Sequence, residues 1–345
     1  MKWNGLASFA RMIGAAGRGW RAAVCGATIL AATGGSLQAA TLAYWRFEGD
    51  GTAPPVAGTT QVEDTNGRAV TNTGVGMRVP DVSGNGNTVW AWEHAFAGHT
   101  YQSDVPAATV PQTGAPNGFS VINAGGFPAM FTWSRQSVPT VDVETIKPLA
   151  WTIEASIKST NIGGNRTFVG RDGNRDAATG DANRAPLYFK TLNGVLQILF
   201  TDEAGNVYDL SDPTGALALN TWYNVAAVSD GTTLSLYKDS GAGYQLVNSL
   251  ALMATDARLN YDDGGSTSAG DAQWGWTIGR GRYGGATGQG DGHVDRWLGS
   301  IDEVRISDSA LTPSQFLFAA VPEPGSLALA GMGLAALALG RRRTS

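Results

Sequence analysis

GSIDEVRISDSALTPSQF, residues 299–316, is the stretch that decides the fold. Its first half belongs to a β-branched run, 297–307, bounded by turn-forming residues, and such a run predicts a β-strand. Consecutive side chains of a regular strand point to opposite faces, so Asp302 and Glu303 are expected to lie on opposite sides of a sheet. The strand is expected to be one of many, because similar runs recur throughout the chain.

Short β-branched and aromatic runs alternate with clusters of Gly, Asn, Asp and Pro, and long helical periodicity is absent. The predicted strands before 297–307 are 41–49, 87–96, 150–159, 166–171, 186–192, 195–202, 206–210, 222–230, 233–239, 244–250 and 274–280. The dipeptides Asn193-Gly194 and Asp230-Gly231 predict tight hairpins, because these residues tolerate positive φ. Many antiparallel strands with one apolar face predict an all-β protein of two packed sheets.

The order of these segments resembles the concanavalin A-like, laminin-G-type domain of bacterial surface proteins. The resemblance rests on AYWRFEG, DVSGNGN, WTIEASIKS, WYNVAAVSDGTTLSLYKD, TIGR and GSIDEVRISDSALTPSQF. The matching positions are Trp45, Glu48, Asp81, Ser83, Gly84, Asn85, Gly86, Trp151, Glu154, Trp222, Tyr237, Gly299, Ile301, Asp302, Glu303, Arg305 and Leu311. It implies a two-sheet antiparallel jelly-roll sandwich over 41–320. Residues 97–148 depart from the pattern and form either a decorated loop or an extra hairpin.

The chain ends in VPEPGSLALAGMGLAALALGRRRTS, residues 321–345, whose uncharged run of 16 residues would span about 24 Å as a helix. A permanent membrane span needs about 20 residues, so the run is short for an anchor. The tail resembles the PEP-CTERM sorting signal, which has a proline-acid-proline knot, a short apolar helix and a basic end. The corresponding residues are Pro322, Glu323, Pro324, Arg341, Arg342 and Arg343. A C-terminal core helix is the alternative, although this run lacks the polar face such a helix needs.

The resemblance implies a Gram-negative-type bacterium, transient inner-membrane insertion of the tail, and cleavage by an exosortase-type protease. The protein would then reach the cell surface or the extracellular polymer matrix. Residues 1–40 agree, because four basic residues precede the apolar stretch 22–35 and small residues at Ala39 and Ala40. This layout predicts a secretory signal peptide, with a membrane-bound N-terminal helix as the alternative.

The segment left after both ends are removed, 41–322, has 17 basic and 28 acidic side chains, a net charge near −11. That charge argues against nucleic acid or an anionic membrane as partner, because both attract positive proteins. The only cysteine, Cys25, lies in the predicted signal peptide, so the mature protein is expected to have no disulfide.

The sequence offers no convincing catalytic set. A retaining glycoside hydrolase needs two carboxylates about 5–5.5 Å apart on one face, whereas Glu154 stands alone with Ser156 where a second acid would be needed. The histidines, His94, His99 and His293, lack zinc-ligand spacing. We therefore expect a non-enzymatic protein.

Calcium is a plausible structural ion for an acidic, extracellular, cysteine-free protein, because it prefers oxygen ligands. In concanavalin A-like domains such an ion often joins the first strand to the last, which implies Glu48 and Asp302 here, with a backbone carbonyl from 81–87. The alternative is that Asp302 and Glu303 form ordinary ion pairs with Arg46 or Arg305. A further irregular loop, 171–181, could also hold calcium, although it lacks the hand-type ligand pattern.

The candidate carbohydrate site is the glycine-rich loop 279–297, where Tyr283, His293 and Trp297 could stack on sugars and Asp291 could bind hydroxyls. The pairs Trp90/Trp92 and Trp274/Trp276 more often belong to a core. We therefore predict an exported surface or matrix module that binds polysaccharide. The alternatives are a structural or adhesive protein with a surface-protein partner, and a divergent glycoside hydrolase.

Overall fold

The computed structural model describes residues 41–69, 75–91, 98–123, 130–171, 185–253, 256–259, 275–281 and 295–321. The predicted signal peptide, residues 322–345 of the sorting tail and the loop residues Tyr283, Asp291 and His293 lie outside these ranges. Within them, no helix is long and apolar enough to cross a membrane.

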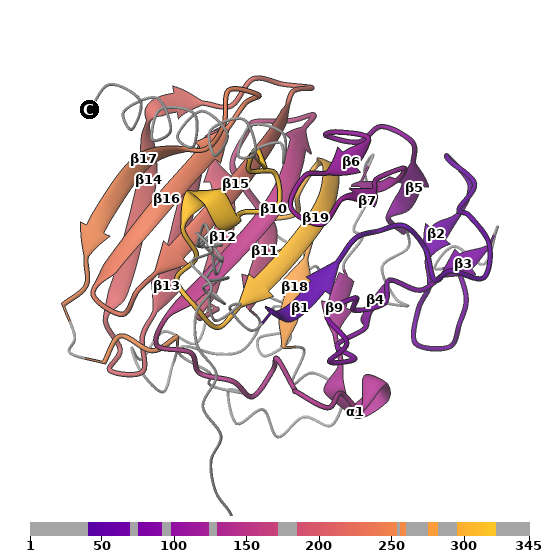
Figure 1. The fold of residues 1–345 in the computed structure, drawn as a ribbon, viewed down its shortest axis with the longest axis horizontal. Coiled ribbons are helices and arrows are strands. Elements are labelled where there is room, and N and C mark those ends of the chain that lie inside the picture. Colours follow the sequence, from indigo (N-terminus) through magenta and orange to yellow (C-terminus); the bar gives the residue numbers. More distant parts are fainter. Residues whose placement is uncertain are drawn as a thin grey trace, which may run out of the picture. The chain divides into compact units, whose positions relative to one another are not determined.

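The larger sheet has ten strands in the order β17-β16-β15-β10-β19-β8-β5-β2-β3, with β1 paired to β19 (Figure 1). Its strands are β1 (Thr41–Trp45), β2 (Gln61–Val62), β3 (Gly76–Met77), β5 (Thr100–Gln102), β8 (Ser120–Asn123), β10 (Trp151–Ser159), β15 (Trp222–Ser229), β16 (Thr233–Asp239), β17 (Gln245–Ala251) and β19 (Gly299–Ser307). Neighbouring strands run antiparallel, except β2 and β3. The last strand in the sequence, β19, therefore lies in the middle of the sheet.

The smaller sheet has seven strands in the order β14-β13-β12-β11-β18-β9-β4. They are β4 (Val89–Ala91), β9 (Met130–Thr132), β11 (Asn165–Arg171), β12 (Leu187–Leu192), β13 (Val195–Thr201), β14 (Val207–Ala216) and β18 (Trp276–Ile278). The remaining elements are the hairpin β6 (Thr109–Val110) and β7 (Ala115–Pro116), the single turn α1 (Ser134–Ser137) and the 3-10 turn η2 (Pro313–Gln315).

One continuous core lies between the two sheets. Ile153 and Val225 of the larger sheet belong to the same apolar cluster as Phe189 and Ile198 of the smaller sheet. Across the interface, the rings of Trp151 and Phe200 pack edge to face with their centres 5.3 Å apart. The predicted all-β, two-sheet sandwich is confirmed.

The atypical segment 97–148 contributes strands to both sheets. It is therefore more than the decorated loop or the extra hairpin that the sequence predicted. It supplies β5 and β8 to the larger sheet, β9 to the smaller sheet, and the β6–β7 hairpin. The hairpin covers part of the outer face of the larger sheet, because Val110 packs against Tyr44 and Leu317. The segment is therefore part of the sandwich and helps to enclose the site described next.

Candidate functional site

A β-bulge in β19 brings two carboxylates to the same face. Ser156 is opposite Asp302 and Glu154 is opposite Arg305, so β19 has an extra residue between these pairs. Glu303 has a positive φ of 50° and Val304 is buried in the core. The expectation that Asp302 and Glu303 face opposite sides is therefore wrong, because the bulge breaks the regular alternation.

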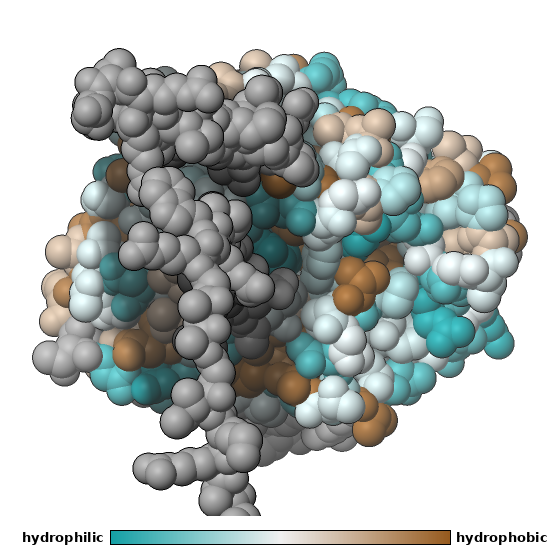
Figure 2. Space-filling model, viewed as in Figure 1, coloured by the Kyte–Doolittle hydropathy of each residue, from teal (hydrophilic) through white to brown (hydrophobic). Residues whose placement is uncertain are grey.

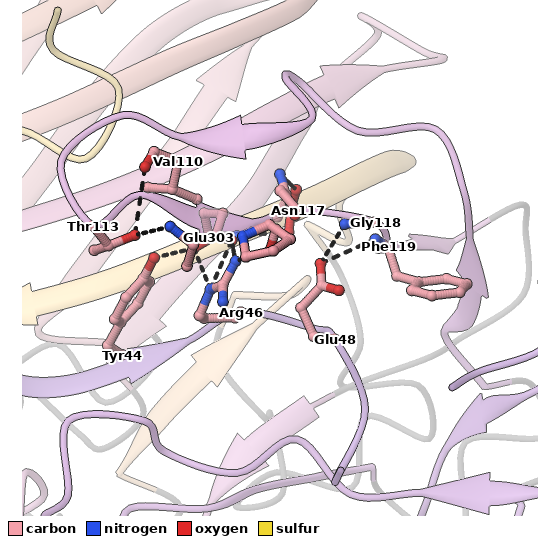
Figure 3. Close-up of polar contacts among 12 residues, drawn as sticks. Tyr44, Arg46, Glu48, Val110, Thr113, Asn117, Gly118, Phe119 and Glu303 are labelled. Carbon is pink, nitrogen blue, oxygen red and sulfur yellow. Dashed lines mark hydrogen bonds and ion pairs between the residues drawn. The ribbon is translucent and has the colours of Figure 1, made fainter. Parts of the chain in front are cut away.

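Glu303 is held by Tyr44, which belongs to β1, and by Arg46, which directly follows β1. Its carboxylate pairs with Arg46, with Nη2 of Arg46 and Oε1 of Glu303 3.0 Å apart, and accepts a hydrogen bond from the Tyr44 hydroxyl (Figure 3). Arg46 also donates to the Pro116 carbonyl at 2.6 Å, so it connects β19 to the hairpin segment. Burial raises the pKa of Glu303 to about 7, although Arg46 and Tyr44 oppose the shift.

Asp302 is fully buried, with an exposed fraction of 0 %. Its Oδ2 accepts from the Asn117 amide at 2.9 Å, and its Oδ1 accepts from the Glu303 backbone N–H at 2.9 Å. Burial, followed by the negative charge of Glu303, raises the pKa of Asp302 well above its usual range, and Glu48 adds to the effect. Within the described ranges no cation pairs with Asp302, so its charge is poorly compensated.

Glu48 lies beside the segment that contains Asn117. Its Oε1 accepts from the backbone N–H groups of Gly118 and Phe119 at 2.8 and 3.0 Å (Figure 3). Asn117, which binds Asp302, directly precedes these two residues. The dipeptide Asn117-Gly118 therefore links the two predicted calcium ligands, Glu48 and Asp302.

Asp302 and Glu48 both accept hydrogen bonds from the short segment 117–119. The buried Oδ1 of Asn117 has no hydrogen-bond partner among the described residues. Among the described residues no group of three His, Cys, Asp or Glu side chains could hold a metal. The available set is two carboxylates and one amide oxygen.

The ion pairs near Asp302 and Glu303 test the expectation that these two acids pair with Arg46 or Arg305. The Glu303–Arg46 ion pair is confirmed, whereas Arg305 pairs with Glu154, with Nε and Oε2 2.6 Å apart. In the turn 81–87, the Asp81 carboxylate accepts hydrogen bonds from the backbone N–H groups of Tyr44 and Asn87. That turn is tied to β1. A backbone carbonyl of this turn as a calcium ligand stays a prediction.

Glu154, the lone candidate acid, is closed off from solvent. Besides Arg305, its carboxylate accepts from the Leu317 backbone N–H at 2.7 Å. Burial raises the pKa of Glu154, and Arg305 opposes this shift. These contacts give Glu154 a structural role in holding the segment after β19.

Trp297 is not a rim residue, and its assignment to a sugar-binding surface is wrong. Its exposed fraction is 0 %, its ring packs edge to face on Phe168 at 5.3 Å, and its indole N–H donates to the Ser300 carbonyl at 3.0 Å. Trp297 lies two residues before the central strand β19, and its side chain belongs to the core between the sheets. Tyr283, Asp291 and His293, predicted for the same loop, lie outside the described residues.

Trp222 forms an alternative aromatic surface that the sequence did not single out. Among the described tryptophans, only Trp133 and Trp222 are not buried. The indole N–H of Trp222 donates to Oδ1 of Asp104 at 3.1 Å, and Lys158 pairs with the other oxygen of Asp104. Nζ of Lys158 lies 5.6 Å from the centre of the Trp222 ring. We call Asp104, Lys158 and Trp222 the Trp222 surface.

The Trp222 surface lies on the outer face of the larger sheet, since Trp222 and Lys158 are opposite each other on β15 and β10. The next outward position across the sheet is Ser300, which accepts a hydrogen bond from Gln102. Figure 2 shows hydrophilic and hydrophobic residues next to one another in the middle of this view where grey atoms do not cover it. Around Trp222 the described residues therefore place hydrogen-bonding groups beside the aromatic ring, and Ser300 itself is buried.

Comparison with protein families gives one match, to the PEP-CTERM protein-sorting motif over residues 320–343. The chain therefore carries this sorting motif, which implies an exported protein that is sorted to the cell surface. No curated protein sequence matches the chain significantly.

Several solved structures have a similar fold at low identity. Domain 4 of AbnA, a GH43 extracellular arabinanase from Geobacillus stearothermophilus, solved with arabinotriose, is 14% identical with a TM-score of 0.47, and the match covers 81% of this chain and 97% of that one. The botulinum neurotoxin serotype D binding domain is 11% identical (TM-score 0.43), covering 80% of this chain and 49% of that one. A heptameric SAP-like pentraxin from Limulus polyphemus is 17% identical (TM-score 0.32), covering 49% and 69%.

Proposed function

We propose that this protein is an exported, non-catalytic β-sandwich that binds a polysaccharide at the cell surface or in the extracellular matrix. In this proposal an exosortase-type protease removes the tail, and a calcium ion bound at Glu48, Asn117 and Asp302 fixes the outer face of the sandwich. The sorting motif at 320–343 is the observation that carries the location.

The Trp222 surface supports polysaccharide as the ligand. Sugars place their C–H faces on aromatic rings while charged and amide groups bind their hydroxyls. Trp222 offers the ring, and Asp104, whose side chain is 46% exposed, offers a carboxylate at the indole edge. Because Lys158 neutralises Asp104 and the segment 41–322 is strongly acidic, a neutral glycan is favoured over a uronic acid polymer.

A calcium ion would join three parts of the chain. Glu48 follows β1, Asn117 follows β7, and Asp302 belongs to the central strand β19. The ion would compensate the buried charge of Asp302 and satisfy the unpartnered oxygen of Asn117. Its role would be structural, because it would hold the hairpin segment against the sheet.

Binding of the secreted protein to immobilised polysaccharides tests the ligand. We expect a neutral glucan or arabinan to bind, and Trp222→Ala to weaken binding about tenfold or more, a loss of ~1.4 kcal/mol. Trp133→Ala is the matched control, because Trp133 is also partly exposed but lies next to α1. If the wild type binds no glycan with or without calcium, the adhesive alternative with a protein partner replaces this proposal. Glycan cleavage would instead show an enzyme.

Thermal unfolding with calcium or a chelator tests the ion. Calcium at about 100 times its Kd should stabilise the wild type by about 2.7 kcal/mol, because only the folded state has the site. Asp302→Asn should abolish the response, whereas Glu203→Gln, which changes a carboxylate paired with Lys147 on the surface, should keep it.

The pH dependence gives a second measurement on Asp302→Asn. The pKa of Asp302 is raised in the folded state above its usual value of 3.8. Its contribution to the free energy of unfolding is therefore complete below pH 3.8 and is lost as the pH rises. Without calcium, the wild type should therefore lose stability relative to Asp302→Asn as the pH rises, and calcium should reverse this trend. An equal calcium shift in both proteins would contradict the site.

A further inference from the structure

The segment after β19 folds back over the outer face of the larger sheet. We call residues 311–319 the terminal strap; it contains η2 and is the yellow segment that follows β19 in Figure 1. Glu154 accepts a hydrogen bond from the Leu317 backbone N–H at 2.7 Å, and Arg305 donates to the Gln315 carbonyl at 2.8 Å. The same buried ion pair, Glu154–Arg305, therefore holds two backbone groups of the strap.

The hairpin segment holds the strap from its other side. The backbone N–H of Gln112 donates to the Leu317 carbonyl at 3.1 Å, and its side-chain amide donates to the carbonyls of Ser314 and Ala319 at 2.9 and 3.3 Å. These bonds occupy backbone groups along the strap up to Ala319. A protease that binds an extended substrate would need the same groups.

Apolar packing holds the strap in place in addition to these hydrogen bonds. Phe316 is fully buried, and its ring packs edge to face against Tyr237 and Tyr244, with ring centres 5.3 and 4.8 Å apart. Leu317 and Phe318 are also buried. Releasing the strap would therefore expose three large apolar side chains to water, which is unfavourable.

The strap ends where the sorting motif begins. Ala319 is 7% exposed, Ala320 is exposed and Val321 is 51% exposed. The family match starts at residue 320, so at most two exposed residues separate the folded body from Pro322. The chain has no spacer between the sandwich and its sorting signal.

We infer that the folded sandwich limits where the C-terminus of the mature protein can lie: the strap shields residues 311–319, so the sorting protease leaves a C-terminus at residue 320 or later. The inference rests on the proposed processing. In this hydrolysis the peptide C–N bond breaks, water supplies hydroxyl to the carbonyl carbon, and a proton goes to the departing amine. The sandwich keeps its complete strap, because segments bound in the fold are cut only after local opening.

Intact-mass measurement of the full chain, expressed with its sorting machinery, tests the inference. The wild type should give a single C-terminus at residue 320 or later. Phe316→Ala should give additional, shorter C-termini within the strap, because the lost ring contacts favour its release. Leu234→Ala is the control, since it removes a buried side chain of β16 outside the strap and should keep the single terminus. A wild-type C-terminus within 311–319 would overturn the inference while leaving the processing intact.

Limited thermolysin digestion of the purified full chain gives a second test that does not depend on the sorting protease. Thermolysin cuts at apolar residues, and we expect cleavage at Val321 but none at Phe316, Leu317 or Phe318. Cleavage at these three residues in the folded wild type would show that the strap gives no protection. An uncut tail in cells, with the strap protected in this digestion, would overturn the processing proposal and with it the sorting role of the strap.

Discussion

His99 is a buried histidine that should make the fold sensitive to acid. Its exposed fraction is 1%, and neither ring nitrogen has a partner among the described residues. Its Nε2 would lie only 2.5 Å from a Cβ placed on Gly279, so the ring is tightly enclosed. Burial lowers the pKa of His99 from 6.5 to about 3, because the charged form would be desolvated.

A lowered folded-state pKa means that the unfolded chain takes up the proton first. The stability contribution of neutral His99 is therefore complete above pH 6.5 and decreases by about 1.4 kcal/mol per unit as the pH falls toward 3. His99→Leu should remove this loss, as measured by urea unfolding at pH 7 and pH 4.5. The same pH dependence in the variant would contradict the assignment.

Individual site residues differ in how far the sequence could reveal them. Glu48 and Asp302 were identified through the resemblance, and the structure places both beside Asn117-Gly118. Asn117 itself lies in the atypical segment, so no pattern pointed to it. Trp297 was misassigned because a tryptophan beside a glycine-rich loop resembles a rim residue, whereas its neighbour, the strand β19, turns it into the core.

Among the elements, the long strands were the predictable part. β10, β12, β13, β15 and β16 begin and end within two residues of the predicted ranges, because each has a continuous apolar face. β2 and β3 have two residues each, which is too short for any periodic signal. The β19 bulge was also unpredictable, because Glu303 adopts a backbone conformation that few non-glycine residues favour.

The Asn193-Gly194 hairpin was predicted and is confirmed, with φ of 49° and 82° at these residues. A Cβ on Gly194 would approach the Cβ atoms of Ala216 and Ile162 to 3.0 Å, and the positive φ adds strain. Gly194→Ala should therefore lower the free energy of unfolding by about 1–3 kcal/mol. Gly215→Ala is the control, since Gly215 also has positive φ but no atom nearby. Equal losses in urea unfolding would argue against the contact.

The pairing of the larger sheet depends on β19, the last of the described strands. β19 pairs with β10, β8 and β1, so it joins strands from the beginning and the middle of the domain. A chain ending at residue 298 should fail to fold, because β1 and β8 would lose their central neighbour. A chain ending at residue 321 should fold with the Tm of the domain that carries its tail. Circular dichroism and urea unfolding of both chains check this, and a cooperative transition in the shorter chain would contradict it.

The central position of β19 also determines when folding can start. Synthesis makes the N-terminal part first, and that part has no partner for the exposed edges of β10 and β8 until residues 299–307 appear. Long-range pairing of this kind is slow compared with local structure. A chain exported as proposed therefore stays unfolded while it passes through a translocation channel. Its larger sheet is completed only by residues 299–307, which come shortly before the sorting motif at 320–343 in the sequence.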